Sequence, residues 1–142
     1  VYPLRISQIL LGNDLKVLNS KLIYSKKYNV NIGGYATLEQ NNTSIFSQIY
    51  FGFGSFYRNS IELFGSKGKI IAERIFTSPP NQKTEIYIYT DKGKVIKEIK
   101  IQNHFENMLN YVYKVIKDND LKQQEYENNI NQSRLLDILN QN

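Results

Sequence analysis

The feature that most constrains the fold of this chain is a repeated pairing of short apolar segments around tight turns. The turn groups are Asn41–Thr43, Gly65–Gly68 and Asp91–Gly93, and each separates two segments rich in β-branched and aromatic residues. Asparagine and glycine tolerate the positive φ angles that tight hairpins require. Because hairpins join antiparallel neighbours, the sequence predicts a largely antiparallel sheet.

Seven segments have the composition of strands. They cover residues 15–24, 34–40, 44–54, 60–64, 69–76, 84–90 and 94–101. In the sixth segment, Ile86 and Ile88 alternate with Tyr87 and Tyr89. Successive side chains of a strand point to opposite faces of a sheet, so this alternation predicts two faces of different chemistry.

Three further segments are predicted to be helices, at residues 3–11, 103–118 and 128–140. Pro3 suits a first helical position, and Gly12 suits a helix stop. Asn103 is a suitable N-cap for the second helix, whose apolar residues recur at helical spacing. The charged and polar stretch from Lys117 to Glu127 is expected to separate the last two helices.

Helices cannot pair with strands, so they must cover a face of the sheet. The predicted fold class is therefore α+β, with a large, open, mostly antiparallel sheet and helices packed on one face. The opposite face is left for a partner or a ligand. A length of 142 residues, of which 41% are apolar, suits one domain with its own core.

Composition excludes several classes of chemistry. The chain has no cysteine, which excludes disulfides, thiolate nucleophiles and cysteine-based zinc sites. This agrees with a reducing compartment, and a cytoplasmic location is expected. No apolar run approaches the roughly 20 residues of a membrane span, so no membrane partner is expected. The lone His104 excludes a histidine-rich metal site and is interpreted as a solvated or helix-packing residue.

The net charge of +5 lies entirely in the first half of the chain. Residues 1–71 hold eight basic and three acidic residues, whereas residues 72–142 hold ten of each. A basic surface can favour an anionic ligand such as a nucleotide sugar, or it can simply be a lysine-rich solvated surface. Nucleic acid is not expected as a partner, because the basic residues are scattered and no nucleic-acid-binding motif accompanies them.

The sequence lacks a dinucleotide-binding fingerprint. Gly52-Phe53-Gly54 has no third glycine at the required spacing, and Gly65–Gly68 is interpreted as a strand turn. The acidic residues show no paired arrangement typical of glycosidases. From its residues alone, the chain is not a complete enzyme.

Two stretches carry a resemblance to a known family. The first, at residues 1–12, reads V-Y-P-L-R-I-S-Q-I-L-L-G, and the second, at residues 57–80, reads Y-R-N-S-I-E-L-F-G-S-K-G-K-I-I-A-E-R-I-F-T-S-P-P. With them, the chain resembles the C-terminal domain of the Gfo/Idh/MocA (glucose–fructose oxidoreductase / inositol dehydrogenase) family. The similarity is closest to members that act as sugar-nucleotide 3-ketoreductases.

The resemblance implies that residues 1–142 are a C-terminal substrate-binding and oligomerisation domain, without the N-terminal Rossmann domain that is its partner in the family. The full-length protein would use NAD or NADP to transfer hydride at a ketone or secondary alcohol of a sugar or nucleotide sugar. No cofactor is expected to bind to this domain alone, which should be inactive. The open sheet face is expected to join subunits into a homo-oligomer.

Five residues are candidates for the site. Tyr2, before Pro3, matches a family tyrosine near the nicotinamide, and the resemblance implies a general acid/base that protonates the ketone oxygen. A capping or packing role for Tyr2 is the alternative. Arg58 and Arg74 could bind phosphate, although Arg74 could instead hold the following loop. Tyr57 and Asn59 could line the sugar pocket or make ordinary hydrogen bonds at a strand end.

A second hypothesis comes from another functional class. The domain could be a stand-alone binding or dimerisation module. In that case an open aromatic face, with Tyr50, Tyr87 and Tyr89, would serve only to join subunits.

Overall fold

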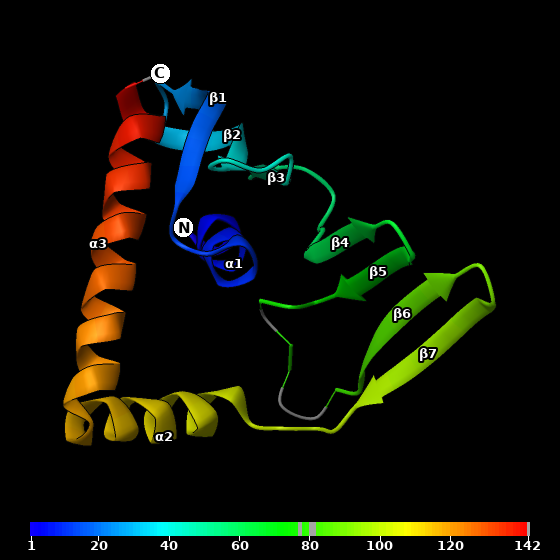
Figure 1. Cartoon of the computed structure of the whole chain (residues 1–142). Coiled ribbons are helices and arrows are strands. Elements are labelled where there is room, and N and C mark those ends of the chain that lie inside the picture. Colours follow the sequence, from blue (N-terminus) through cyan, green and yellow to red (C-terminus); the bar gives the residue numbers. More distant parts are fainter. Residues whose placement is uncertain (77, 80–81, 142) are drawn as a thin grey trace. The chain divides into compact units, whose positions relative to one another are not determined.

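The computed structural model describes residues 1–76, 78–79 and 82–141. The helices of this part of the chain are α1 (Tyr2–Leu11), α2 (His104–Lys117) and α3 (Asn119–Gln141) (Figure 1). The strands are β1 (Leu15–Ser25), β2 (Val30–Gln40), β3 (Phe46–Gly52), β4 (Ser60–Gly65), β5 (Gly68–Glu73), β6 (Thr84–Thr90) and β7 (Gly93–Ile99). No described helix combines the length and apolar character needed to cross a membrane.

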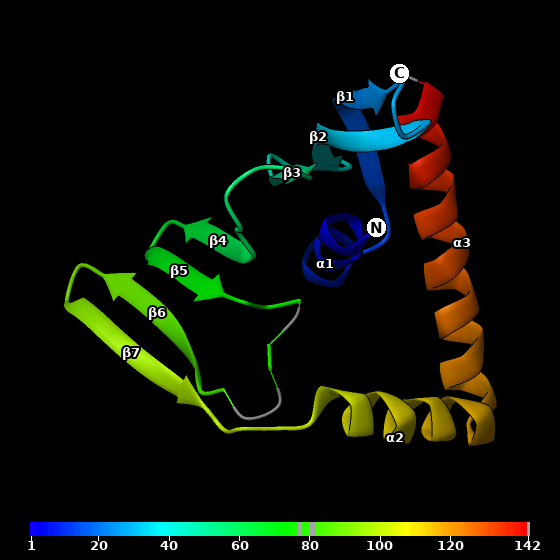
Figure 2. The same cartoon turned by 180° about the vertical axis from the view of Figure 1, so that it is seen from behind.

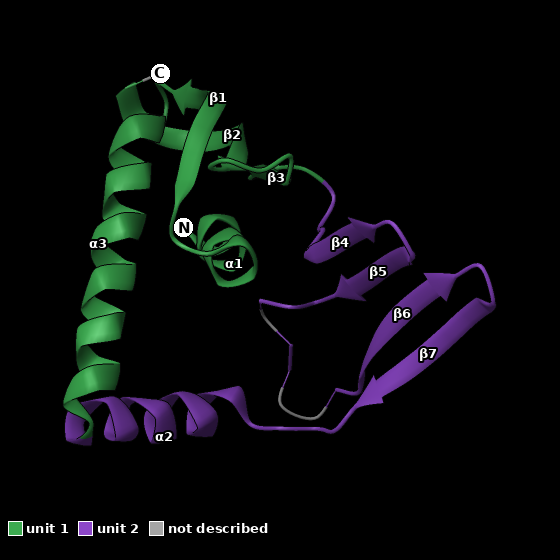
Figure 3. Cartoon of the chain, viewed as in Figure 1, with its two compact units in different colours: residues 1–55, 118–142 green, residues 56–117 purple. Residues whose placement is uncertain are grey.

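The chain divides into two compact units. Unit 1 comprises Val1–Ser55 and Asp118–Asn142, and unit 2 comprises Phe56–Lys117 (Figure 3). Each unit contains one antiparallel sheet, with strand order β1-β2-β3 in unit 1 and β4-β5-β6-β7 in unit 2. The predicted α+β class and antiparallel pairing are confirmed, and the strands form two sheets rather than one large one.

The first hairpin of unit 1 is longer than predicted, because β2 begins at Val30 instead of residue 34. Strand β2 pairs with β1 along its whole length, from Val30 opposite Ser25 to Gln40 opposite Leu15. The sequence did not predict the start of β2, because Gly33 and Gly34 interrupt its apolar pattern. Gly34 is required by close approach of the neighbouring strand, since a Cβ atom there would lie 2.6 Å from the Lys21 carbonyl oxygen.

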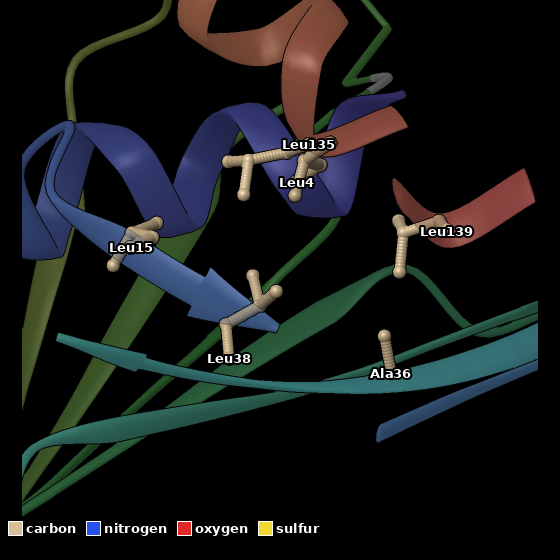
Figure 4. Packing of buried hydrophobic residues seen from close by; sticks show 6 residues of the cluster. All are labelled: Leu4, Leu15, Ala36, Leu38, Leu135 and Leu139. Atoms are coloured by element: carbon tan, nitrogen blue, oxygen red, sulfur yellow. The ribbon is translucent and has the colours of Figure 1, made fainter. Parts of the chain in front are cut away.

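The hydrophobic core of unit 1 lies between its sheet and two helices. Ala36 and Leu38 project from one face of β2, and Leu15 from β1 joins them (Figure 4). Leu4 of α1 and the α3 residues Leu135 and Leu139 complete the cluster. Fully burying a leucine contributes about 2 kcal/mol, so α1 and α3 are held on this sheet face mainly by apolar contacts.

The last helix begins earlier than predicted. The polar stretch before residue 128 is part of α3, which starts at Asn119. The Asp118 side chain is the N-cap, because its Oδ1 accepts the backbone N–H groups of Asp120 and Leu121, each at 3.0 Å. Apolar periodicity could not predict this part of the helix, because its inward-facing residues are polar.

The sheet of unit 2 has two faces of different chemistry, as the alternation in β6 predicts. One face, called here the aliphatic face, carries the residues Ile61, Leu63, Ile70, Ala72, Ile86, Ile88, Val95 and Ile99, together with Thr84 and Lys97 toward one end. The other, called here the mixed face, carries the residues Glu62, Phe64, Lys69, Ile71, Tyr87, Tyr89, Lys94 and Ile96. The hairpin turns fall at Gly65/Gly68 and Thr90/Gly93, where glycine was expected.

Helix α2 departs from the expectation that all helices pack on the sheet. Its predicted N-cap is confirmed, since Asn103 Oδ1 accepts the backbone N–H groups of Phe105 and Glu106 at 3.1 and 3.4 Å. None of its side chains is buried, however. Figures 1 and 2 show from two sides that α2 does not lie over the β4–β7 sheet of its own unit. An amphipathic pattern predicts an apolar stripe but not the surface that covers it.

Candidate functional site

Tyr2 lies in the first turn of α1, in unit 1. Pro3 follows it within the same turn, and the N-cap position is held by Val1, which makes no side-chain capping bond. The Tyr2 side chain is 67% exposed. The helix beneath it is firmly attached, because Leu4 is in the core and Ser7 Oγ lies 2.8 Å from Ser47 Oγ of β3. Tyr2 is therefore a largely exposed phenol at the end of a fixed helix.

Tyr57, Asn59 and Arg74 are brought together in unit 2. Asn59 Nδ2 donates a hydrogen bond to the Tyr57 hydroxyl at 3.1 Å, and Asn59 Oδ1 accepts the Phe76 N–H at 3.1 Å. The Arg74 guanidinium lies 5.9 Å from the centre of the Tyr57 ring, within range of a cation–π contact. These residues form one cluster that joins the start of β4 to the end of β5.

Arg74 has an unusual backbone conformation. Its φ angle is +54°, in the left-handed region, which costs on the order of 1 kcal/mol for a residue other than glycine. Its N–H donates to the Asn59 carbonyl oxygen at 2.5 Å, and its Nη1 donates to Gln82 Oε1 at 3.3 Å. The second bond spans the segment that follows β5, which supports the loop-holding interpretation of Arg74.

Arg58 is not directed into this cluster. Its Nη2 forms an ion pair with Glu62 Oε1 at 3.0 Å, and its Nε donates to Ser60 Oγ at 3.1 Å. The arginine side chain is 76% exposed. An anionic ligand would therefore compete with Glu62 for this guanidinium.

A polar hollow lies beside Arg74 in unit 2. It is lined by Glu73, Arg74, Gln82, Lys83, Thr84, Glu85 and Tyr87. Lys83 Nζ pairs with Glu98 Oε2 at 3.2 Å. The Tyr87 hydroxyl donates to Glu85 Oε2 at 2.7 Å, and this hydrogen bond, together with the negative charge of Glu85, raises the pKa of Tyr87.

Sequence reasoning missed most of the residues that line this hollow. Arg74 was a candidate, whereas Gln82, Lys83 and Glu85 were not. The β5–β6 pairing brings the start of β6 beside the end of β5, and the predicted strands already implied that juxtaposition. Thr77 and Pro80 of the quoted R-I-F-T-S-P-P stretch lie outside the described residues. Tyr2 belongs to the other unit.

His104 is exposed, and its ring centroid lies 4.3 Å from that of Phe105, in agreement with a solvated role. Within the described ranges, no group of three or more histidine, aspartate or glutamate residues could hold a metal ion.

No protein-family model matches the chain. Among curated proteins, it is 31% identical over 93 residues to a dTDP-3,4-didehydro-2,6-dideoxy-alpha-D-glucose 3-reductase of Streptomyces violaceoruber, which covers 66% of this chain and 27% of that enzyme. The reductase of the same name from Actinomadura kijaniata is 32% identical over 88 residues, or 62% of this chain and 26% of that enzyme. The chain thus spans about a quarter of the length of these relatives.

The fold is shared with a solved 3-ketoreductase from Actinomadura kijaniata in complex with NADP and TDP-benzene. The TM-score is 0.90 with 23% sequence identity, over 99% of this chain and 43% of the reductase chain. The same reductase has been solved as a variant with phenylalanine in place of a tyrosine, again with TDP-benzene and NADP. The chain is therefore similar in sequence and in fold to part of sugar-nucleotide 3-ketoreductases.

Proposed function

We propose that this chain is the C-terminal substrate-binding and oligomerisation domain of an NADP-dependent oxidoreductase of the Gfo/Idh/MocA type, which reduces a keto group on a nucleotide-linked sugar. The observation that carries the proposal is the fold match over 99% of the chain to a reductase solved with NADP and TDP-benzene. Sequence similarity to dTDP-sugar 3-reductases supports it. We also propose a cytoplasmic location, in keeping with the absence of cysteine.

The cofactor would be held by a separate N-terminal Rossmann domain. Residues 1–142 contain no glycine-rich dinucleotide fingerprint, so they do not fit a dinucleotide on their own. NADPH, when bound, supplies the hydride to the carbonyl carbon of the keto sugar. This domain supplies groups that bind the sugar nucleotide and move a proton.

Tyr2 is the proposed proton donor. As hydride reaches the carbonyl carbon, negative charge develops on the ketone oxygen, and the Tyr2 hydroxyl donates its proton to that oxygen. Exposure of the phenol at the end of a fixed helix supports this assignment, because a general acid must reach the substrate and must be held on a rigid structural element. The reverse oxidation would use the phenolate as the base.

The cluster in unit 2 is the proposed substrate-binding region. Tyr57 and Asn59 offer a hydroxyl and an amide suited to sugar hydroxyl groups, and Arg74 and Arg58 offer guanidinium groups suited to the diphosphate. The hydrogen bond between Asn59 and Tyr57 orders the pair. Arg74 would act both on the ligand and on the loop that it already holds.

The test is the reductase activity of the full-length protein with NADPH and a dTDP-linked 3-keto sugar. Tyr2→Phe should lower kcat by about 10² to 10⁴, the usual range for loss of a general acid, while circular dichroism shows an unchanged fold. Tyr28→Phe, which alters an exposed tyrosine in the β1–β2 turn, is the matched control. Unchanged turnover of Tyr2→Phe would remove its catalytic role, and an inactive wild-type protein would contradict the proposed function itself.

The aliphatic face of unit 2 favours a role in assembly. Four strands about 4.8 Å apart and roughly six residues long present on the order of 400 Å² of sheet surface, and a largely apolar patch of this size often marks an interaction site. On the mixed face, the Lys94 ammonium lies 4.4 and 5.6 Å from the ring centres of Tyr87 and Tyr89, which suits contact with water. We therefore propose that the aliphatic face, rather than an aromatic one, packs against a second copy of the chain.

Light scattering distinguishes the two faces of the sheet. Ile88→Glu should convert an oligomer into a monomer, because it places a charge in the proposed interface. Tyr89→Glu changes the next residue of the same strand on the mixed face and should leave the mass unchanged. A wild-type chain that is monomeric at all concentrations, or equal effects of the two variants, would contradict assembly through the aliphatic face.

A further inference from the structure

One face of α3 is polar over its first half and apolar over its second. The residues Glu125, Asn128, Gln132, Leu135 and Leu139 recur at intervals of three and four and therefore lie on one side of the helix. Leu135 and Leu139 are buried in the core of unit 1. The three polar residues continue the same stripe along the rest of the inward side.

Each polar residue of this stripe contacts α1 or the residues at its ends. Glu125 Oε2 pairs with Arg5 Nη2 at 2.7 Å, and the two side chains are 23% and 25% exposed. Asn128 Oδ1 accepts a hydrogen bond from Asn13 Nδ2 at 2.7 Å. Gln132 Nε2 donates to the Val1 carbonyl oxygen at 3.4 Å. The contacts thus run from the residue before α1 to the loop that follows it.

We call this line of contacts between α1 and α3 the seam. On the α1 side it also includes Gln8, which is 4% exposed. Its Nε2 donates to Asn13 Oδ1 at 3.1 Å and to the Asn128 carbonyl oxygen at 3.5 Å. Its Oε1 has no hydrogen-bond partner among the described residues. A buried polar atom without a partner lowers stability, so an apolar residue here would serve adhesion between the helices better.

Polar and apolar halves of a helix contact do different things. Apolar packing is non-directional and sets mainly the distance between two elements. Hydrogen bonds and ion pairs require particular distances and angles, and they fix rotation and axial position. The polar half of the seam therefore determines how far α1 is rotated and shifted along α3, while the leucines hold the two helices together.

Tyr2 is the residue of α1 to which such precision matters. It follows Val1, whose carbonyl oxygen accepts both the Gln132 side chain and the Arg5 N–H at 3.0 Å. Tyr2 directly follows this carbonyl group in the chain, so a shift of Val1 moves the Tyr2 backbone with it. A displacement of about 1 Å at a reacting group can lower a rate up to about a hundredfold.

We propose that Glu125 and Gln132, acting through Arg5 and the Val1 carbonyl group, are positioning residues that set Tyr2 for proton transfer. This inference rests on the proposed function. It assigns to the polar half of α3 a part in the reaction without contact with the substrate.

The test uses the full-length protein with NADPH and a dTDP-linked 3-keto sugar. Glu125→Gln should lower kcat about fivefold to tenfold with little change in KM, and Gln132→Ala should lower it about threefold. Arg5→Glu combined with Glu125→Arg should restore part of the loss. The matched control is Glu127→Gln, because the Glu127 carboxylate accepts a hydrogen bond from within α3, from Gln123 Nε2 at 3.2 Å.

A double-mutant cycle separates positioning from general stability. In a Tyr2→Phe background, Glu125→Gln should cause no further loss of kcat, because the group that it positions is gone. Equal multiplicative losses in both backgrounds, or a Glu125→Gln variant as active as Glu127→Gln, would overturn the inference. Full activity of Tyr2→Phe itself would instead contradict the catalytic assignment of Tyr2 on which the inference rests.

Discussion

The two units are built from the same kind of sheet, but only one has a hydrophobic core. In unit 1, residues from β1 and β2 pack with α1 and α3 around Leu4 and Leu38. In unit 2, Ala72 is the one buried hydrophobic residue among those described. Both sheets alternate apolar and polar side chains. The difference shows that alternation produces a sheet, whereas a second layer is needed to make a core.

The origin of the second layer explains the difference. Unit 1 closes only when α3, near the end of the chain, packs beside the strands that begin at Leu15. The strands of unit 2 are joined by local connections between neighbours. Its own helix, α2, has no buried side chain. Unit 1 is thus stabilised by its own distant segments, whereas unit 2 has no such second layer of its own among the described residues.

Truncation of the unit 1 core should give the largest effect. Leu38 is 0% exposed, so Leu38→Ala should lower the free energy of unfolding by about 3 kcal/mol through lost burial and a residual cavity. Val95→Ala, on the 59% exposed Val95 of unit 2, should lower it by less than about 0.5 kcal/mol in the monomer. Urea unfolding measures both, and equal effects would contradict the difference between the units.

Glycine substitutions sharpen the comparison within strands. Gly34→Ala in unit 1 should destabilise by about 2 kcal/mol, because the new Cβ would lie 2.6 Å from the Lys21 carbonyl oxygen and the backbone would have to shift. At Gly65 in unit 2, a new Cβ atom would lie 3.8 Å from the Gly68 carbonyl oxygen, which is an ordinary contact. The free energy of unfolding of Gly65→Ala should therefore be within about 0.5 kcal/mol of the parent. Thermal unfolding provides the measurement. A neutral Gly34→Ala would show that the strands are less tightly packed than described.

The ion pairs should differ in the same direction. Double-mutant cycles should give a coupling of about 1 kcal/mol for Arg5–Glu125, whose side chains are mostly buried, and about 0.3 kcal/mol for Arg58–Glu62, which is exposed. The smaller coupling should also disappear first as salt is added. Equal coupling energies would place the two pairs in equivalent environments, contrary to their exposure.

The smallest effect concerns the ionisation of Tyr87. The hydrogen bond to Glu85 and its charge raise the pKa of Tyr87, so the protonated phenol is favoured in the folded state. Its contribution to stability is present below the ordinary tyrosine pKa of about 10 and is lost as pH rises through the raised value. The difference between the ultraviolet titration curves of the parent and of Tyr87→Phe should show one tyrosine that ionises at a pH above the ordinary value. Glu85→Gln should bring that titration to lower pH; no change would exclude Glu85 as the cause.

Sequence patterns were most reliable where the structure is local. The turns at Gly65–Gly68 and Asp91–Gly93, the alternation in β6 and the N-cap Asn103 are all confirmed. They were less reliable for the start of β2 and for the first half of α3. At these two places the residue type depends on a contact with a distant segment, since Gly34 lies against Lys21 and Glu125 pairs with Arg5. A local sequence pattern contains no information about such contacts.

The candidate site shows the same division. Tyr57, Asn59 and Arg74 were found from a motif, and the structure joins them by contacts between the start of β4 and the end of β5. Arg58 instead pairs with Glu62, only four residues along the chain, and the motif gave no indication of this local partner. The polar seam on α3 was also not predictable, since its partners are more than 100 residues away.

The sequence by itself determined the succession of hairpins, the two chemically different sheet faces and most helix ends, because each depends on residues within one turn or one strand. The tertiary structure alone decided that α1 and α3 cover the unit 1 sheet, that α2 buries none of its side chains, and that Glu125 reaches Arg5. The physical reason is that burial and ion pairing depend on which distant segments meet, and hydrophobic attraction has no direction that a local pattern could encode.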